Sequence, residues 1–246
     1  MTEAVLAGRV ALVTGVSRRK GLGFAIAQQL AIMGADVFIH SYSPYDADRE
    51  WGADLDGTRI AQAEGNFLDR EVPQQIVNAA VQAFGHVDIL VANHTYSTMG
   101  NLEELTAADI DTHLQVNVRG TLLLIQAFAA QHTAPTGGRV ILISSGQHLH
   151  PMPAELAYIA SKGALQPIMT SLSAHLIPRG ITVNTINPGA TDTGWANGEL
   201  YESIRALNPQ GRWGEPEDAA RLIGWLVTDD ARWITGQVIN STGGGV

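Results

Sequence analysis

Tyr158 and Lys162 are the two residues of this chain whose types and spacing most clearly suggest chemistry. They lie four positions apart in the run YIASK, and Lys162 is one of only two lysines in 246 residues. Residues four apart on a helix share a face, so the ammonium and the phenol would lie side by side. A positive charge nearby favours the phenolate and lowers the pKa of a tyrosine from its usual value of about 10. We therefore predict a tyrosine that exchanges protons near neutral pH.

The segment Thr14–Gly23, with the sequence TGVSRRKGLG, could hold a second reactant. It follows an apolar run and precedes apolar residues at helical spacing between Leu22 and Met33. Glycines let a backbone approach a pyrophosphate, which can then bind the free N–H groups at a helix N-terminus. The order of strand, glycine-rich turn and helix predicts a dinucleotide-binding turn.

Apolar strands and helices alternate along the sequence and must position these residues. Continuous apolar runs predict strands at Arg9–Thr14, Ala35–Ile39, Val87–Ala92, Arg139–Ser144, Ile181–Asn187 and Gln237–Asn240. Helical patterns occur at Leu22–Met33, Glu71–Phe84, Thr106–Phe128, Ala157–Leu176 and Pro216–Leu226. Pro167 should kink the fourth of these helices, and Ser43–Gly57 reads as a long loop. The alternation predicts an α/β fold, a doubly wound parallel sheet of about seven strands with helices on both faces.

The composition limits the partners and the location of the protein. A net charge of −9 disfavours nucleic acid and anionic membrane surfaces, which both recognise clustered Lys and Arg. The chain has no cysteine, and so neither a disulfide framework nor a thiolate nucleophile. The N-terminal run MTEAVLAGRV does not have the pattern of a signal peptide. We expect a cytoplasmic protein that binds no nucleic acid and no membrane.

The motifs together resemble the short-chain dehydrogenase/reductase family over nearly the whole chain. The family uses an Asn, a Ser, a Tyr and a Lys for catalysis, and the matching residues are Asn117 in NVRG, Ser145 in LISS, Tyr158 and Lys162. Ser144 is the nearest alternative to Ser145, and the spacing to the tyrosine favours Ser145. These four residues are our candidate catalytic residues.

The resemblance also implies a domain organisation and a cofactor. It implies one Rossmann domain over residues 1–246, with a cofactor half at about 1–140 and a catalytic and substrate half at about 141–246. The positions that match the nicotinamide-dinucleotide contacts of the family are Gly15, Ser17, Arg18, Arg19, Gly21, Leu22, Gly23, Ser41, Asn66, Phe67, Asn93, Tyr158, Lys162, Pro188, Gly189, Thr191 and Thr193. The glycine turn is two residues longer than the usual TGxxxGxG of the family.

The choice between NADP(H) and NAD(H) depends on the end of the second strand. An acid there would bond the ribose hydroxyls of NAD and repel a 2′-phosphate, but residues 40–42 are His-Ser-Tyr. Arg18, Arg19 and Lys20 lie in the neighbouring turn and could meet a phosphate. We predict a preference for NADP(H), with NAD(H) as the alternative.

Candidate substrate contacts lie where the chain departs from the pattern of the family or carries large side chains near the catalytic motifs. They are His94, in an ANHT run that replaces the NNAG of the family, and Tyr96, His148, Met152 and Trp195. Tetrahedral zinc sites need more ligands than the HLH run that begins at His148 supplies. We therefore predict no metal site.

The resemblance implies hydride transfer between the cofactor and a ketone or secondary alcohol. Tyr158 would exchange the proton with the substrate oxygen, and Lys162 would lower the pKa of the tyrosine and bond the nicotinamide ribose. Ser145 would bond the substrate oxygen, and Asn117 would position a water. Relatives are commonly homotetramers, so we also expect a homo-oligomer.

Three other functions stay open on the sequence. A 3-oxoacyl-carrier-protein reductase fits the overall resemblance and the position of Arg179, but residues 120–138 contain no Lys or Arg to meet an acidic carrier. An enoyl reductase would place its tyrosine seven residues before the lysine, where this chain has Glu155. A catalytically silent NADP-binding regulator or scaffold is suggested by the altered ANHT run. A small free ketone or secondary alcohol is the substrate class we favour.

Overall fold

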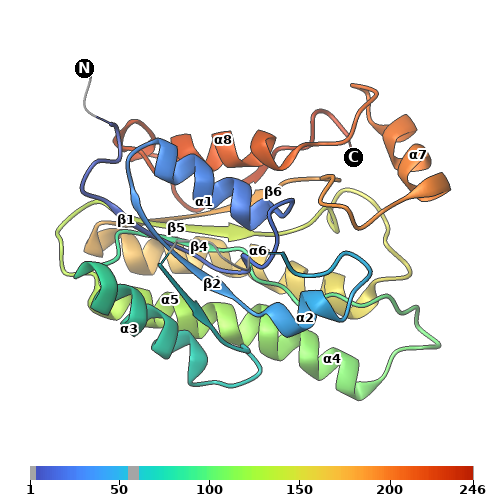
Figure 1. The fold of residues 1–246 in the computed structure, drawn as a ribbon, viewed down its shortest axis with the longest axis horizontal. Coiled ribbons are helices and arrows are strands. Elements are labelled where there is room, and N and C mark those ends of the chain that lie inside the picture. The colour runs from blue at the N-terminus through green and yellow to red at the C-terminus, as the bar shows by residue number, and fades with distance from the viewer. Residues whose placement is uncertain (1–3, 55–60, 246) are drawn as a thin grey trace.

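Seven parallel strands form one sheet in the computed structural model, which describes residues 4–54 and 61–245 (Figure 1). The strands are β1 (Val10–Val13), β2 (Asp36–Ser41), β3 (Ala61–Glu64), β4 (Ile89–Ala92), β5 (Gly138–Ile143), β6 (Ile181–Asn187) and β7 (Val238–Asn240). Their order across the sheet is β3-β2-β1-β4-β5-β6-β7. This order and the parallel pairing confirm the predicted doubly wound Rossmann fold.

Helices connect the strands and lie on both sides of the sheet (Figure 1). They are α1 (Leu22–Ile32), α2 (Ser43–Ala47), α3 (Val72–Phe84), α4 (Ala107–His113), α5 (Thr121–Gln131), α6 (Leu156–Leu176), α7 (Gly198–Leu207) and α8 (Pro216–Leu226). A π-helical turn, η1 (Leu114–Gly120), joins α4 to α5, and two 3-10 turns are η2 (Ile177–Arg179) and η3 (Asp229–Ala231). Thr106 caps α4 by accepting the backbone N–H of Asp109 at 3.1 Å, as the sequence predicts.

Two apolar cores lie on the two faces of the sheet. One core joins α3, α5 and α6 to the first face, and the other joins α1 and α8 to the second. Alternate residues of one strand serve different cores, since Val10 and Leu12 face the first, whereas Ala11 and Val13 face the second. Burial on both faces explains why these strands are continuous apolar runs.

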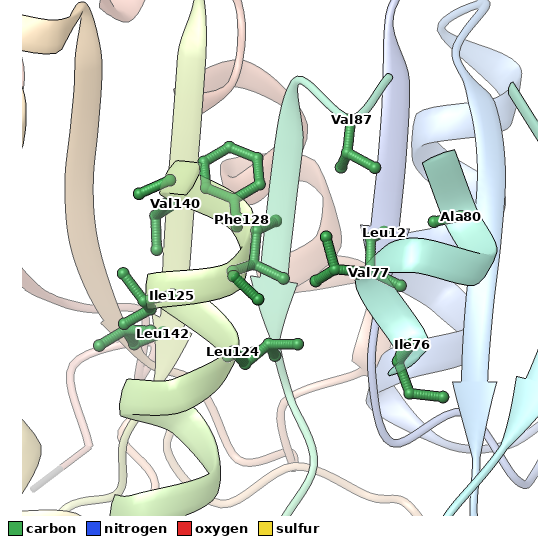
Figure 2. Packing of buried hydrophobic residues seen from close by; sticks show 14 of the residues in the cluster. Leu12, Ile76, Val77, Ala80, Val87, Leu124, Ile125, Phe128, Val140 and Leu142 are labelled. Carbon is green, nitrogen blue, oxygen red and sulfur yellow. The ribbon is translucent and has the colours of Figure 1, made fainter. Parts of the chain in front are cut away.

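The first core fixes α3 and α5 against the sheet, as Figure 2 shows from close by. The packed side chains from these helices and from the strands include Ile76, Val77, Ala80, Leu124, Ile125, Phe128, Leu12, Val140 and Leu142. Burial of each large apolar side chain stabilises the fold by roughly 1.5–3 kcal/mol. The packing holds the carboxyl ends of the strands, where the polar motifs lie, in fixed relative positions.

The strand order reverses between β1 and β4, and ligands of open α/β sheets bind at the carboxyl ends of the strands beside such a point. The ends of these two strands are joined directly. The backbone N–H of Thr14 donates to Val91 at 3.0 Å, and the backbone N–H of Asn93 donates to the Thr14 hydroxyl at 3.1 Å. The glycine-rich turn and the ANHT run therefore meet at the predicted ligand-binding edge.

The structure differs from the sequence prediction in four elements. Strand β3, helix α7 and the π-helical turn are additional, and α2 occupies the start of the segment predicted to be a long loop. Part of that segment, residues 55–57, lies outside the described residues. Pro167 lies inside α6, which runs as one continuous helix.

Candidate active site

Tyr158 and Lys162 lie within α6, as predicted, and Lys162 is almost fully buried. The lysine Nζ donates a hydrogen bond to the backbone oxygen of Ile143 at 3.0 Å, at the end of β5. It lies 6.0 Å from the centre of the Tyr158 ring. The pair is therefore assembled on one side of α6, with the ammonium anchored to the sheet.

Burial controls the proton affinity of both groups. It raises the pKa of Tyr158 to about 12, although the Ser145 side chain opposes the rise. Burial also lowers the pKa of Lys162 to about 8. The prediction of a lowered tyrosine pKa is wrong for the free protein, because desolvation of the phenolate outweighs the influence of the ammonium. The phenol is thus protonated at neutral pH.

Ser145, rather than Ser144, has the position expected of the catalytic serine. The Ser144 hydroxyl is buried and donates to the backbone oxygen of Ile186 on the neighbouring strand at 3.5 Å. The Ser145 side chain interacts with Tyr158 and is partly exposed. The structure therefore supports the choice that the sequence spacing favours.

Asn117 lies in the π-helical turn η1 and is 1% exposed. Its side-chain oxygen accepts the backbone N–H of Tyr96 at 2.7 Å and the hydroxyl of Thr95 at 3.3 Å. Its amide nitrogen donates to the backbone oxygen of Tyr96 at 2.9 Å and to the Ser161 hydroxyl at 2.8 Å. All four bonding positions of the amide are used. The predicted water-positioning role is therefore not open to the side chain, which instead ties the segment after β4 to α6.

The glycine-rich turn forms a close backbone cradle between β1 and α1. A Cβ at Gly15, where φ is +71°, would lie 2.6 Å from the Cα of His94. A Cβ at Gly23 would lie 2.6 Å from the side-chain nitrogen of Asn93, which bonds the backbone oxygens of Thr14 and Gly15 at 3.0 Å. Only glycine fits at these two positions.

The first-turn N–H groups of α1 have no acceptor within the helix. Helix α1 begins at Leu22, directly after the turn, and Gly21 caps it without a side-chain bond. An anion at this helix end would meet both the backbone donors and the positive end of the helix dipole. The cradle and the helix end together fit the pyrophosphate of a dinucleotide.

Arg18 connects three segments across the cradle. Its guanidinium donates to the backbone oxygen of Thr193 at 2.9 Å and lies 3.4 Å from the carboxylate of Asp46 on α2. It also stacks on the ring of Trp51 at 5.0 Å, and that indole donates to Asp46 at 2.9 Å. Arg18 thus joins the glycine turn to the segments after β2 and β6.

The other two basic residues of the turn, Arg19 and Lys20, also bind acidic residues elsewhere in the chain. The Arg19 backbone N–H donates to Asp54 at 2.6 Å, and the Lys20 ammonium lies 2.9 Å from Asp192. Sequence reasoning missed these carboxylates because they lie far from the turn in the sequence. A phosphate that binds Arg18 or Lys20 must therefore share that cation with a carboxylate, whereas the Arg19 guanidinium donates to the backbone oxygen of Asp54 at 3.2 Å.

The end of β2 carries buried hydroxyls and no acid of its own, as predicted. Ser41 ends β2 and is buried, as is Ser17 of the neighbouring glycine turn. The Ser17 hydroxyl accepts the backbone N–H of Tyr42 at 3.4 Å. An acid nevertheless comes from β3, since Glu64 pairs in register with Ser41 and accepts the Ser43 backbone N–H at 2.9 Å. The sequence did not reveal Glu64 because β3 itself was not predicted.

Tyr45 was not among the predicted site residues, although it binds the segment after β4. Its hydroxyl donates to the backbone oxygen of Ser97 at 2.9 Å and accepts the Ser97 N–H at 3.2 Å. Arg49 adds a bond to the same oxygen at 3.3 Å and lies over the Tyr45 ring at 4.6 Å. Tyr45 also raises the pKa of Tyr158, a smaller effect than burial. The segment after β2 therefore reaches the catalytic centre.

His94 is a structural residue rather than a substrate contact. It is 5% exposed and stacks on Phe67 with 4.0 Å between the ring centres. Its ring nitrogens lie 2.8 Å from the Thr14 hydroxyl and 3.3 Å from the Thr121 hydroxyl. Burial holds the pKa of His94 well below its usual range, so the ring is neutral. The imidazole packs against the glycine-rich turn. The structure therefore contradicts the prediction that His94 contacts the substrate.

Of the other cofactor candidates, Asn66 and Phe67 follow β3. The Asn66 side chain accepts the Leu68 N–H at 2.9 Å, and the Phe67 ring is buried, leaving its backbone for a contact. The Pro188–Gly189 turn follows β6, and the Thr191 hydroxyl bonds the oxygens of that turn, both at 3.3 Å. These residues stay predictions for cofactor contacts.

The remaining substrate candidates differ in their burial and contacts. Tyr96 and Met152 are partly buried, and Tyr96 packs between Tyr45 and His113 with ring centres 5.7 and 4.8 Å away. Trp195 is 45% exposed and donates to the backbone oxygen of Thr191 at 3.2 Å.

His148 is exposed, and its ring nitrogen forms a hydrogen bond of 3.0 Å with the side chain of Gln166 on α6. Within residues 4–54 and 61–245, no group of three or more His, Cys, Asp or Glu side chains could hold a metal ion. In the same residues, no helix is long and apolar enough to cross a membrane.

Comparisons with known proteins agree with this fold. A family model described as Enoyl-(Acyl carrier protein) reductase matches residues 15–245. The uncharacterized oxidoreductase YjdA of Bacillus subtilis is 37% identical over 244 residues, which cover 96% of each protein. A short chain dehydrogenase from Burkholderia cenocepacia, solved in complex with NADP, is 35% identical with a TM-score of 0.85, over 98% of each chain.

The angucycline C-6 ketoreductase LanV, solved with bound NADP, is 34% identical with a TM-score of 0.86, over 98% of this chain and 96% of that chain. The family model and these relatives each match nearly the whole chain. The chain therefore belongs to the short-chain dehydrogenase/reductase family.

Proposed function

We propose that the protein is an NADP(H)-dependent oxidoreductase that interconverts a small ketone and the corresponding secondary alcohol. The observation that carries the proposal is the partly buried phenol of Tyr158 beside Ser145 and the anchored ammonium of Lys162. The glycine cradle at the adjacent switch point supplies a dinucleotide site. When bound, the nicotinamide cofactor would supply the hydride in reduction and accept it in oxidation.

The chain would handle the proton and the orientation of the substrate. In reduction, the Tyr158 hydroxyl donates its proton to the substrate oxygen, which the Ser145 hydroxyl also bonds. Proton donation leaves a phenolate, and the nearby Lys162 ammonium offsets that negative charge. The bond from Lys162 to Ile143 holds the ammonium in place before the proton moves.

Two features support NADP(H) as the cofactor. Three cations lie in the glycine turn, and β2 itself ends in Ser41 and carries no acid there, although Glu64 of β3 lies beside Ser41. The NADP complexes of LanV and of the Burkholderia dehydrogenase have the same fold. Arg18 is the best placed to meet a 2′-phosphate, since its guanidinium reaches Asp46 on α2, the helix that follows β2, and could bind the phosphate in place of that carboxylate.

A small free carbonyl compound fits better than a carrier-bound acyl group. Arg179 lies in η2, before the start of β6, and donates to the backbone oxygen of Ala129. Arg179 therefore lies at the amino ends of the strands, whereas the catalytic residues lie at the carboxyl ends. Without that arginine at the mouth of the site, an acidic carrier protein lacks the positive partner that its recognition needs.

We also propose that the protein forms homo-oligomers, with a tetramer expected from the family. Trp233, between η3 and β7, is 95% exposed, and Trp225 on α8 is 45% exposed. Val238 on the edge strand β7 is 37% exposed. Large exposed apolar side chains beside an edge strand are typical of a surface that another subunit covers.

Absorbance at 340 nm tests the proposed activity. The protein is mixed with NADPH or NADH and a panel of ketones, β-ketoesters, sugars, an enoyl thioester and a 3-oxoacyl thioester. We expect oxidation of NADPH with simple ketones and a lower KM for NADPH than for NADH. A lower KM for NADH would contradict the cofactor choice, and turnover of the enoyl thioester alone would contradict the reaction class. Absence of turnover with every compound would favour a non-catalytic NADP-binding protein.

A further inference from the structure

Glu155 lies directly before α6 and is held in place by backbone bonds on both sides. The Gly100 N–H donates to Ala154 at 2.6 Å, and the Leu156 N–H donates to Gly100 at 3.3 Å. These bonds form an isolated parallel bridge between Gly100 and Glu155. The backbone position of Glu155 is therefore set by the segment after β4, which also carries Tyr96.

Glu155 and Tyr158 occupy neighbouring positions at the start of α6. Glu155 is the residue before the first turn of α6, and Tyr158 is the third residue of that turn. In a capping box the side chain at the first of these positions reaches the backbone N–H of the second, so a side chain at Glu155 is within reach of Tyr158. In agreement, the Glu155 charge raises the pKa of Tyr158, an effect smaller than that of burial.

The carboxylate of Glu155 is partly buried, and burial raises the pKa of this carboxyl above its usual value. It makes no side-chain bond to the helix end. In the parts of the chain that the structure describes, no ion pair or side-chain hydrogen bond satisfies it. Such a carboxylate retains the capacity to accept hydrogen bonds from a ligand and to repel an anion.

We propose that Glu155 selects the substrate: it favours ketones that carry a hydrogen-bond donor, such as an amide or hydroxyl, near the carbonyl, and disfavours ketones that carry a carboxylate. The inference rests on the proposed function, since it assigns a neighbour of Tyr158 to substrate recognition. Two negative charges roughly 6 Å apart at an effective dielectric constant near 20 change an affinity by more than tenfold. A donor at the same distance gains a charge-assisted hydrogen bond.

Levulinamide, methyl levulinate and levulinate share one ketone skeleton and differ in the group that would meet Glu155. With NADPH, we expect kcat/KM of the wild type to fall in that order. Glu155→Gln, which keeps the shape and removes the charge, should raise the ratio of kcat/KM for levulinate to that for levulinamide by about tenfold or more. Glu217→Gln removes the same charge from an exposed position on α8, on the opposite face of the sheet, and should keep the wild-type ratio.

A ratio that changes by less than about twofold in Glu155→Gln would overturn the selection by Glu155 while leaving the proposed oxidoreductase intact. The melting temperature and NADPH affinity of the variant show whether it is folded. If another ketone is turned over but these three are not, they are measured as competitive inhibitors, and the same change is expected in the ratio of their inhibition constants. No turnover of any carbonyl compound would instead contradict the proposed function, and the inference with it.

Discussion

Burial acts in opposite directions on the two members of the catalytic pair. It raises the pKa of Tyr158 to about 12 and lowers the pKa of Lys162 to about 8, because both charged forms lose hydration. At pH 7 the pair thus consists of a neutral proton donor and an ammonium ion. The ammonium has its largest effect after the phenol has given up its proton, because only then does a negative charge face it.

The buried ammonium of Lys162 should leave a signature in the pH dependence of stability. The folded state binds fewer protons than the unfolded state between pH 8 and 10.5, so stability rises with pH in that window and is lost as pH falls through 8. In Lys162→Met, we expect the slope of the unfolding free energy between pH 8 and 9.5 to be less positive by up to about 1.4 kcal/mol per pH unit. Urea unfolding at several pH values measures it.

Lys20→Met is the matched control, since it removes the only other lysine from an exposed ion pair with Asp192. It should keep the slope of the wild type. An identical slope in the Lys162→Met variant would show that burial does not depress the lysine pKa. Restricting the comparison to pH values below 10 keeps the titration of Tyr158 out of the window.

Sequence position gave the identity of the site residues but not the direction of their side chains. His94 was predicted to contact the substrate, yet its ring is buried against the glycine turn, where it bonds Thr14 and Thr121. Asn117 is in the expected helical region, but its side-chain amide forms hydrogen bonds with Tyr96 and Ser161 and is not free to position a water. Contacts between residues far apart in the sequence decide both outcomes.

Among the elements, the strands buried on both faces were predictable, whereas the edge strand β3 was not. The strands β1, β4, β5 and β6 are covered on both faces and appear as continuous apolar runs. β3 has the sequence AQAE, with no strongly apolar residue, at the edge of the sheet. α7 was not predicted although Leu200, Ile204 and Leu207 recur at helical spacing, and none of its residues is buried.

The segment after β2 owes its placement to Tyr45, and hydrogen exchange can detect that contact. The Ser97 N–H has the Tyr45 hydroxyl as its acceptor at 3.2 Å. In Tyr45→Phe, we expect exchange of the Ser97 amide to accelerate by about tenfold, as a hydrogen bond of about 1–1.5 kcal/mol is lost. NMR-detected exchange on the folded protein measures this rate.

The neighbouring Thr98 amide is an internal control for the Tyr45→Phe experiment. It donates to the ring nitrogen of His113 at 3.3 Å, a bond that the substitution does not remove. Its exchange should stay close to that of the wild type. Unchanged exchange at Ser97 would mean that Tyr45 does not hold the segment after β2 against the segment after β4.

At the scale of the whole molecule, the exposed Trp233 should be covered in an oligomer. Trp233→Glu places a charge on the apolar surface beside β7 and should shift the assembly toward smaller species, because burial of an unpaired charge is unfavourable. Light scattering coupled to size exclusion gives the mass of each form. A wild-type protein that is already monomeric would contradict the proposed oligomer. Leu207→Glu, at a residue 79% exposed on α7, serves as the comparison.

Tyr158 is proposed to donate the proton in a reduction supported by NADPH. The most direct measurement is kcat for ketone reduction by Tyr158→Phe, compared with the wild type at neutral pH, together with the NADPH dissociation constant of both proteins. Loss of a general acid predicts a fall in kcat of roughly 10²–10⁴-fold, with NADPH binding nearly unchanged. Near-full activity in the Tyr158→Phe variant would contradict the account.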